Sequence, residues 1–295
     1  VGDMVKLSVG RCRYTTLLSL SGGIIDDCVA LKFSPEELFL VTNAGALDQV
    51  AGHLKRYVPE IENLSAAMAK IDVQGPLAPK VMLEAGFSGV DALSFWAGGR
   101  FTWDGVDVIV TRAGYTGELG YEIFVPDTAA LRLWRVLRAL PEVLPCGLGA
   151  RDTLRTEMCY ALSGQDVDEA RTPLEAGLDR FIAWDTEFPG KSVMETQRES
   201  GDYQVLTPLR SVDKRAPRHG FELRHDGAVV GEVTSGTFGP SVGCGVGLGY
   251  IPAALARPGL QLEAGPRSLP VVVETAPLYK QATGRNRIEI GNLKA

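Results

Sequence analysis

The sequence is poor in residues that bind metals or form disulfides. Its 295 residues include three histidines and five cysteines. The cysteines are widely spaced, odd in number and form no C-x-x-C pair, which is typical of reduced thiols rather than of a disulfide framework or a zinc site. We therefore expect no metal centre and no disulfide.

Other absences exclude whole classes of partner. No apolar run approaches the length of a membrane span, so we expect no membrane partner. The net charge is −6, the pI is about 5.3, and lysine and arginine form no long cluster, which argues against nucleic acid as a partner. The opening Val1-Gly2-Asp3-Met4 carries no targeting pattern and indicates that further sequence precedes it. We expect a cytoplasmic location, in the bacterial cytosol or the mitochondrial matrix.

The hydrophobic pattern changes near residue 200. Up to about Gln197, strands and helices alternate irregularly, with hairpins between them. The polar stretch Glu199-Ser200-Gly201-Asp202 follows, and beyond it short strands alternate with turns rich in glycine and proline. We expect an α+β domain over residues 1–199 and a small antiparallel barrel or sandwich over residues 200–295.

Local patterns predict several elements of the first domain. Apolar residues at helical spacing predict a helix that begins after Asn43, as its N-cap, and ends before Pro59. The pair Asp104-Gly105 between two apolar strands predicts a two-residue hairpin. Asp127 is expected to cap a further helix. The buried side of that helix is expected to contain Leu131, Trp134 and Leu137, with Leu133, Val136 and Leu140.

The stretch Gly22-Gly23-Ile24-Ile25-Asp26-Asp27 organises the first domain. Two glycines permit a turn with positive φ or a close approach to the backbone, and two isoleucines anchor the chain in a core. Neighbouring residues of a strand point to opposite faces, so the two carboxylates should diverge. Asp26 or Asp27 can then face a cavity. A solvated turn is the simpler reading of these six residues alone.

Residues 112–123 place three glycines in one loop between strands. Glycine has an entropic cost there, which suggests strained turns or a ligand close to the backbone. Tyr115 offers an aromatic face, and Glu118 offers two acceptors that match a heterocycle with adjacent N–H donors. An ordinary decorated hairpin is the alternative.

Residues 147–155 begin a helix with a glycine-rich turn, which is an anion-receptive geometry. Leu148, Leu154 and Met158 are expected to be buried, and Arg151 and Arg155 to lie on another side. Arg151 is a candidate clamp for a carboxylate or a ring carbonyl. The alternative is an exposed arginine or one paired within the protein.

Taken together, these motifs resemble the glycine cleavage system T-protein, the tetrahydrofolate-dependent aminomethyltransferase family. Six segments carry the resemblance, in order: residues 22–27, 72–76, 112–123, 147–155, 168–178 and 233–238. The resemblance covers nearly the whole chain. It implies a multi-lobed cloverleaf of the α+β class, with two α/β lobes, a C-terminal antiparallel β-barrel and folate bound in the central hole.

The same resemblance implies the site. The family's catalytic aspartate falls on Asp26, its pterin-binding glutamate on Glu118 and its folate-contacting arginine on Arg151. Further lining positions fall on Tyr14, Asn43, Tyr115, Trp184 and Tyr279. The sequence departs from the family at Ser19, where asparagine is common, and at Cys28, where an aliphatic residue is usual. Family segments resembling F-x-G-W and F-D-V-S-H-M, which precede these motifs, are not contained in the sequence.

The implied reaction moves the methylene of an aminomethyl group from the lipoyl arm of the H-protein to tetrahydrofolate and releases ammonia. Tetrahydrofolate is then a co-substrate, the lipoylated H-protein is the partner, and no metal takes part. Two alternatives stay open. One is a related tetrahydrofolate-dependent demethylase of a methylated sulfur or amine compound, and the other is a folate-binding paralogue without turnover.

Overall fold

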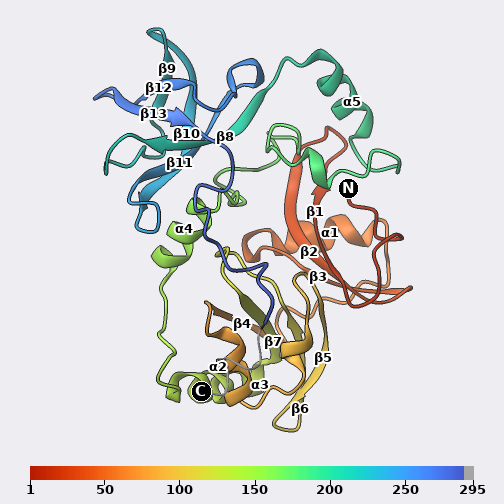
Figure 1. Cartoon of the computed structure of the whole chain (residues 1–295). Coiled ribbons are helices and arrows are strands. Elements are labelled where there is room, and N and C mark those ends of the chain that lie inside the picture. Colours follow the sequence, from red (N-terminus) through yellow and green to blue (C-terminus); the bar gives the residue numbers. More distant parts are fainter. Residues whose placement is uncertain (289–295) are drawn as a thin grey trace.

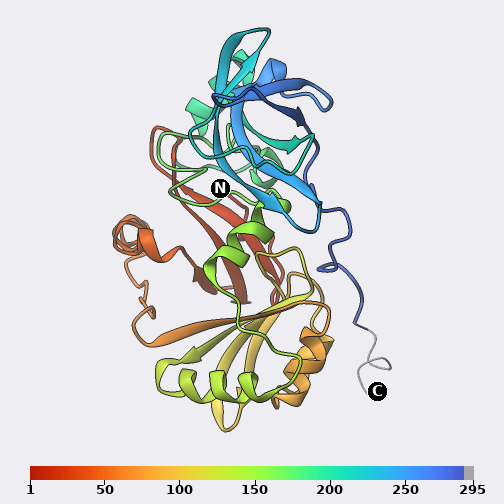
Figure 2. The ribbon, with the colours of Figure 1, turned by 90° about the vertical axis from the view of Figure 1, so that its left-hand side faces the viewer.

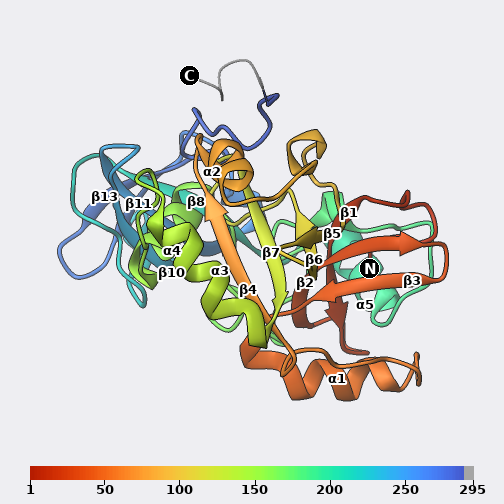
Figure 3. The ribbon, with the colours of Figure 1, turned by 90° about the horizontal axis from the view of Figure 1, so that it is seen from below.

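Three β-sheets organise the described part of the chain, one in each lobe (Figure 1). The structure is a computed structural model, and it describes residues 1–288. Seen from below, the barrel, the second lobe and the first sheet follow one another from left to right (Figure 3). The predicted α+β cloverleaf with a C-terminal antiparallel barrel is confirmed.

The first sheet is antiparallel and contains β1 (Cys12–Leu18), β2 (Ile24–Ser34) and β3 (Glu37–Val41). Both glycines of the predicted turn lie between β1 and β2. Gly22 has a φ of 85°, which L side chains rarely adopt. A Cβ atom on Gly23 would collide with the carbonyl oxygen of Glu169. The expected close approach is therefore present, and the approaching group is the protein's own backbone.

The helix predicted after the first sheet is confirmed, but its cap is not. A 3₁₀ turn, η1 (Ala44–Ala46), leads into α1 (Leu47–Lys55), which buries Val50. Asn43 makes no capping hydrogen bond. Its amide nitrogen donates to the carboxylates of Asp26 and Asp27, which as charged acceptors bind an N–H strongly.

The second sheet has the order β4-β7-β6-β5 and is also antiparallel. Its strands are β4 (Met68–Gln74), β5 (Gly98–Trp103), β6 (Val106–Thr111) and β7 (Gly120–Pro126). The predicted hairpin joins β5 to β6, with positive φ at both Asp104 (48°) and Gly105 (75°). The helices α2 (Ala78–Glu84) and α3 (Asp127–Ala139) and the 3₁₀ turn η2 (Val90–Ala92) belong to the same lobe.

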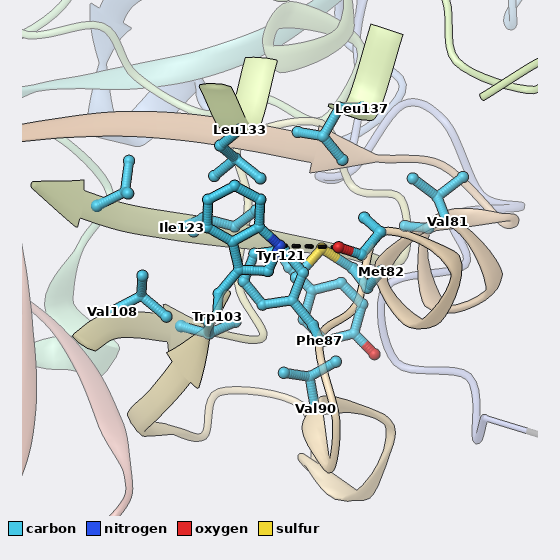
Figure 4. Packing of buried hydrophobic residues seen from close by; sticks show 14 of the residues in the cluster. Val81, Met82, Phe87, Val90, Trp103, Val108, Tyr121, Ile123, Leu133 and Leu137 are labelled. Carbon is cyan, nitrogen blue, oxygen red and sulfur yellow. Dashed lines mark hydrogen bonds between the residues drawn. The ribbon is translucent and has the colours of Figure 1, made fainter. Parts of the chain in front are cut away.

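The largest apolar core lies between this sheet and its helices (Figure 4). Trp103 is buried there beside Ile123 and Leu133, and its Nε1 donates to the Ala85 carbonyl oxygen at 2.8 Å. The one polar group of the buried indole therefore has a hydrogen-bond partner.

The buried face predicted for α3 is partly wrong. Leu133 and Leu137 are buried as expected, but Leu131 and Trp134 are 59% and 44% exposed. The face that packs on the sheet is set by side chains four residues apart, and Leu131 and Trp134 lie off that stripe. Asp127 is the first residue of α3 rather than its cap, because β7 continues to Pro126.

The C-terminal barrel closes in the order β10-β11-β8-β13-β12-β9. Its strands are β8 (Gln204–Ser211), β9 (Glu222–His225), β10 (Ala228–Gly239), β11 (Cys244–Pro252), β12 (Gln261–Ala264) and β13 (Leu269–Val273), with the 3₁₀ turn η4 (Ala253–Leu255) after β11. Inward-facing residues such as Leu209, Leu223 and Val233 form its core. Closure leaves this sheet without a free edge.

Helices and irregular segments connect the lobes. Helix α4 (Leu148–Glu157) lies between the barrel and the second lobe and packs against β10 and β11 (Figure 2). The 3₁₀ turn η3 (Asp179–Phe181) and α5 (Lys191–Ser200) lead to the barrel. The boundary between domains 1–199 and 200–295 stays a prediction. Among the helices of residues 1–288, none combines the length and apolar character that crossing a membrane requires.

Candidate functional site

Asp26 is fully buried on β2, with 0% of its surface exposed. The Asn43 backbone N–H donates to Asp26 Oδ2 at 3.0 Å, and Asn43 Nδ2 donates to Oδ1 at 2.8 Å. The Ser163 hydroxyl donates to Oδ1 at 3.3 Å. These donors compensate for the loss of hydration that burying a carboxylate entails.

Asp27 is half-buried and shares a donor with Asp26. Tyr14 donates its hydroxyl to Asp27 Oδ2 at 3.0 Å, and Asn43 Nδ2 lies 2.9 Å from Oδ1. Burial raises the pKa of the Asp27 carboxyl above its usual value, and the neighbouring Asp26 charge adds to this effect. The expected alternation of burial along the strand is present, but the two carboxylates do not diverge completely, because both contact one amide.

A cavity of about 480 Å³ adjoins this carboxylate pair. Asn43 and Ser163, the two residues that donate to Asp26, both line it. Its lining also contains Gln49 and the acidic residues Asp168 and Glu169. The cavity therefore reaches Asp26 through its hydrogen-bond donors rather than through the carboxylate itself.

Tyr115 and Arg151 form a second group. The Arg151 guanidinium lies 4.6 Å from the centroid of the Tyr115 ring, and its Nη1 pairs with Asp72 Oδ2 at 3.3 Å. The Tyr115 ring stacks on Tyr160 at 5.7 Å, and its hydroxyl donates to the Ala161 carbonyl oxygen. The Arg151 side chain is 43% exposed, so it remains open to a ligand despite its pairing.

Glu118 is held from the C-terminal end of the chain. Thr283 donates its hydroxyl to Glu118 Oε2. Tyr279 lies close to Glu118. Burial is the first cause that raises the pKa of the Tyr279 phenol, and the charge of Glu118 is the second. Tyr279 and Glu118 are thus neighbours although they lie far apart in the chain.

Two predicted lining residues lie in different surroundings. Tyr14 contacts the carboxylate pair and packs edge-on against Phe181, at 4.9 Å between ring centroids. Trp184 donates its Nε1 to Asp179 Oδ1 at 3.1 Å and carries the Arg198 guanidinium 4.2 Å from its ring centroid. Its interactions in the described part of the chain connect it to η3 and α5 rather than to the other predicted residues.

A buried ion pair that the sequence pattern did not predict supports the site. Arg155 is 1% exposed, and its Nη1 pairs with Asp166 Oδ2 at 2.5 Å. It also donates to Asp152 and to the Ser235 hydroxyl in the barrel, while Ser235 donates to Asp166 at 2.7 Å. We call these residues, Arg155, Asp166 and Ser235, the junction. The junction fixes the segment that carries both Ser163 and the Ala161 carbonyl.

The prediction for the two sides of this helix is therefore wrong in two places. Leu148, expected to be buried, is 85% exposed, whereas Arg155, expected to lie outside with Arg151, is buried. The apolar spacing did not reveal that Arg155 has acceptors on two other segments, which together make its burial tolerable. The sequence did not identify Ser163, Asp166 or Thr283. Ser163 and Asp166 lie just before the motif at residues 168–178, whereas Thr283 lies outside the recognised motifs. Ser163 and Thr283 contact residues that are distant in the chain.

Comparison with known proteins gives the same result in sequence and in structure. The GCVT N-terminal domain matches residues 1–186, and the glycine cleavage T-protein C-terminal barrel domain matches residues 205–280. Aminomethyltransferases from Nostoc sp. and Thermoanaerobacter pseudethanolicus are 36% and 34% identical over 293 residues, covering 95% and 96% of this chain and 78% of each relative.

A solved structure agrees with these matches. The glycine cleavage system aminomethyltransferase T from Bartonella henselae superimposes with a TM-score of 0.87 at 30% identity, covering 95% of this chain and 79% of that one. Both halves of the chain and its fold thus point to one family, as the motifs predicted. The chain belongs to the glycine cleavage T-protein family.

Proposed function

We propose that this aminomethyltransferase of the glycine cleavage system transfers a methylene group to tetrahydrofolate from the aminomethyl-lipoyl arm of the H-protein. The transferred carbon loses its bonds to nitrogen and sulfur and gains bonds to N5 and N10 of the folate. Ammonia and the dihydrolipoyl carrier are released. The matched family and the names of its relatives support this reaction.

The observation that carries the proposal is a buried carboxylate, Asp26, whose donors Asn43 and Ser163 line a cavity. Positive charge develops on the transferred carbon and its nitrogen neighbours during the reaction. A fixed carboxylate in a water-poor site stabilises such charge more than water does. Asp26 also accepts or relays the proton that N10 gives up as the second bond forms.

The second and third groups would orient the folate. Glu118 presents carboxylate oxygens to the N–H donors on the edge of the pterin, and Arg151, over Tyr115, presents a cation to the acidic or carbonyl groups of the ligand. The side chains of Glu118, Arg151 and Tyr115 are each at least partly exposed, so a reduced folate can reach them. Holding the ring in place lowers the entropic barrier to attack.

The remaining predicted residues complete the proposed wall. Tyr14 and Asn43 contact the carboxylate pair, and Tyr279 lies beside Glu118. Trp184 is included on the resemblance alone. The proposed reaction uses no metal. The named relatives come from bacteria, which supports a cytosolic location.

A turnover assay tests the proposal. The protein is incubated with tetrahydrofolate and aminomethylated H-protein, and ammonia and the methylene product are measured. Equal amounts of both are expected. Turnover of a methylated sulfur or amine compound, with none of the H-protein adduct, would instead assign the demethylase reaction. Binding of tetrahydrofolate without turnover of either donor would assign a folate-binding protein without catalysis.

A further inference from the structure

The segment that follows the barrel returns to the second lobe and lies along its glycine-rich loop. We call residues 274–288 the strap (Figure 1, dark blue). Its first contact is with the end of α4, where the backbone N–H groups of Leu278 and Tyr279 both donate to the Glu157 carbonyl oxygen at 3.0 Å. Its second is with the loop, where Gly284 N donates to the Gly117 carbonyl oxygen at 2.9 Å.

Thr283 is the strap residue that contacts Glu118. Its hydroxyl accepts a hydrogen bond from the Leu119 backbone N–H at 2.9 Å and donates its own hydrogen to Glu118 Oε2. A hydroxyl has one hydrogen to donate. Because the Leu119 N–H occupies its acceptor side, that hydrogen is directed at the carboxylate. One side chain thus fixes both the backbone after Glu118 and the orientation of its carboxylate.

Arg112 holds the strap in place from the other side. The Arg112 guanidinium, on a residue only 5% exposed, donates through Nη2 to the carbonyl oxygens of Gly284 and Asn286 and through Nη1 to that of Leu93. A Cβ atom on Gly284 would lie 2.9 Å from the Gly117 carbonyl oxygen, so a glycine is needed for this approach. The position of Thr283 is therefore determined by contacts on both sides of it.

We propose that Thr283 is a positioning residue for Glu118 and so contributes to the affinity for reduced folate. The inference rests on the proposed function, in which Glu118 binds the pterin. A carboxylate that is already oriented loses less rotamer freedom when a ligand binds, so preorganisation appears as affinity. Thr283 itself contacts Glu118 and not the reacting atoms, so the rate at saturating folate should depend on it little.

Two substitutions at one position test this. Thr283→Val keeps the shape and removes the hydroxyl, and we expect the Kd for tetrahydrofolate to rise by about tenfold while kcat stays within about twofold. Thr283→Ser restores the hydroxyl and is expected to bind within about threefold of the wild type. Thr275→Val is the matched control, because Thr275 lies on the strap, is exposed and binds Lys280 rather than Glu118. An equal loss of affinity in Thr283→Ser, or in Thr275→Val, would overturn the proposal.

A double-mutant cycle with Glu118→Gln separates the two proposals. If Thr283 acts through Glu118, Thr283→Val should have little further effect on the Kd in the Glu118→Gln background. A full, additive loss there would overturn the inference. If Glu118→Gln weakens folate binding and Thr283→Val does not, only the inference fails. If Glu118→Gln leaves folate binding unchanged, the role proposed for Glu118 fails, and the inference with it.

Discussion

The two carboxylates proposed to act on substrate, Asp26 and Glu118, are held in different ways. Asp26 takes two of its hydrogen bonds from Asn43, which follows the same small sheet only 17 residues later. Glu118 takes its hydrogen bond from Thr283, which is 165 residues away. Asp26 is completely buried, whereas Glu118 is partly exposed on a loop.

This difference matches the two tasks proposed for them. A group that stabilises a transition state must stay fixed while the reaction proceeds, and a short, locally bonded sheet provides that. A group that selects a ligand must be accessible, and a loop supported from elsewhere provides both access and order. The junction connects Asp26 with the group formed by Tyr115 and Arg151, because the segment that it anchors contacts Asp26 through Ser163 and Tyr115 through Ala161.

The sharpest test of this comparison is Asp26→Asn. This change keeps the shape but removes the charge and the proton acceptor, so kcat should fall by about 10²–10⁴ while the Kd for tetrahydrofolate changes little. Asp27→Asn is the control at the neighbouring position and should keep most of the rate. Turnover of aminomethylated H-protein and isothermal folate binding measure the two quantities. A larger rate loss in Asp27→Asn would move the catalytic role to the other carboxylate.

The buried ion pair of the junction should contribute more to stability than the exposed ion pair of the same helix. Arg155→Ala leaves Asp166 buried without its cation, which should lower the free energy of unfolding by about 3–5 kcal/mol. Arg151→Ala, which removes a half-exposed ion pair from the same helix, should cost less than about 1 kcal/mol. Urea unfolding of both variants gives the comparison. Equal losses would mean that the buried pair contributes no more than a surface pair.

Glu118→Ala should change binding and leave the chemistry intact. Loss of a charged hydrogen-bonding partner should weaken tetrahydrofolate by about 1–3 kcal/mol. The rate at saturating folate should stay near that of the wild type, which is the reverse of the pattern expected for Asp26→Asn. Titration calorimetry with steady-state kinetics would detect either result, and unchanged affinity contradicts the assignment.

The raised pKa of Asp27 predicts a smaller, pH-dependent effect. Because the folded protein holds the proton on this carboxyl more tightly than the unfolded chain does, its contribution to stability is complete below pH 3.8 and is lost as the pH rises through the folded pKa. Asp27→Asn has no such group. The difference in unfolding free energy, variant minus wild type, should therefore increase with pH above 3.8 and then level off. A difference that does not change with pH would show that folding does not raise the pKa of the Asp27 carboxyl.

The smallest expected effect concerns the predicted domain boundary. Limited proteolysis should cut first near residues 198–202, where α5 ends in an exposed stretch before β8 begins. Because the strap and the junction still join the two halves, the nicked chain should elute as one species. First cleavage within β11 would argue against the boundary.

Local chemistry explains what the sequence could predict. The glycine turn, the hairpin at Asp104-Gly105 and the barrel strands follow from short-range preferences, and the structure contains them. The errors arise where a distant partner decides. Asn43 could not be distinguished from a helix cap without knowing that two carboxylates face it. The burial of Arg155 likewise depends on Asp166 and Ser235, which no spacing within the helix reveals.

The contact between Gly23 and Glu169 has a consequence for the order of folding. The turn before β2 is held by residues that are synthesised much later than the turn itself. Besides the contact of Gly23 with Glu169, Ile24 N donates to the carbonyl oxygens of Asp168, at 3.2 Å, and Arg171, at 2.9 Å. Pairings so remote in sequence form slowly, and a chain emerging from the ribosome offers its N-terminal part first. The sheet that carries Asp26 is thus synthesised well before residue 171, yet its turn reaches its final form only after that residue has emerged.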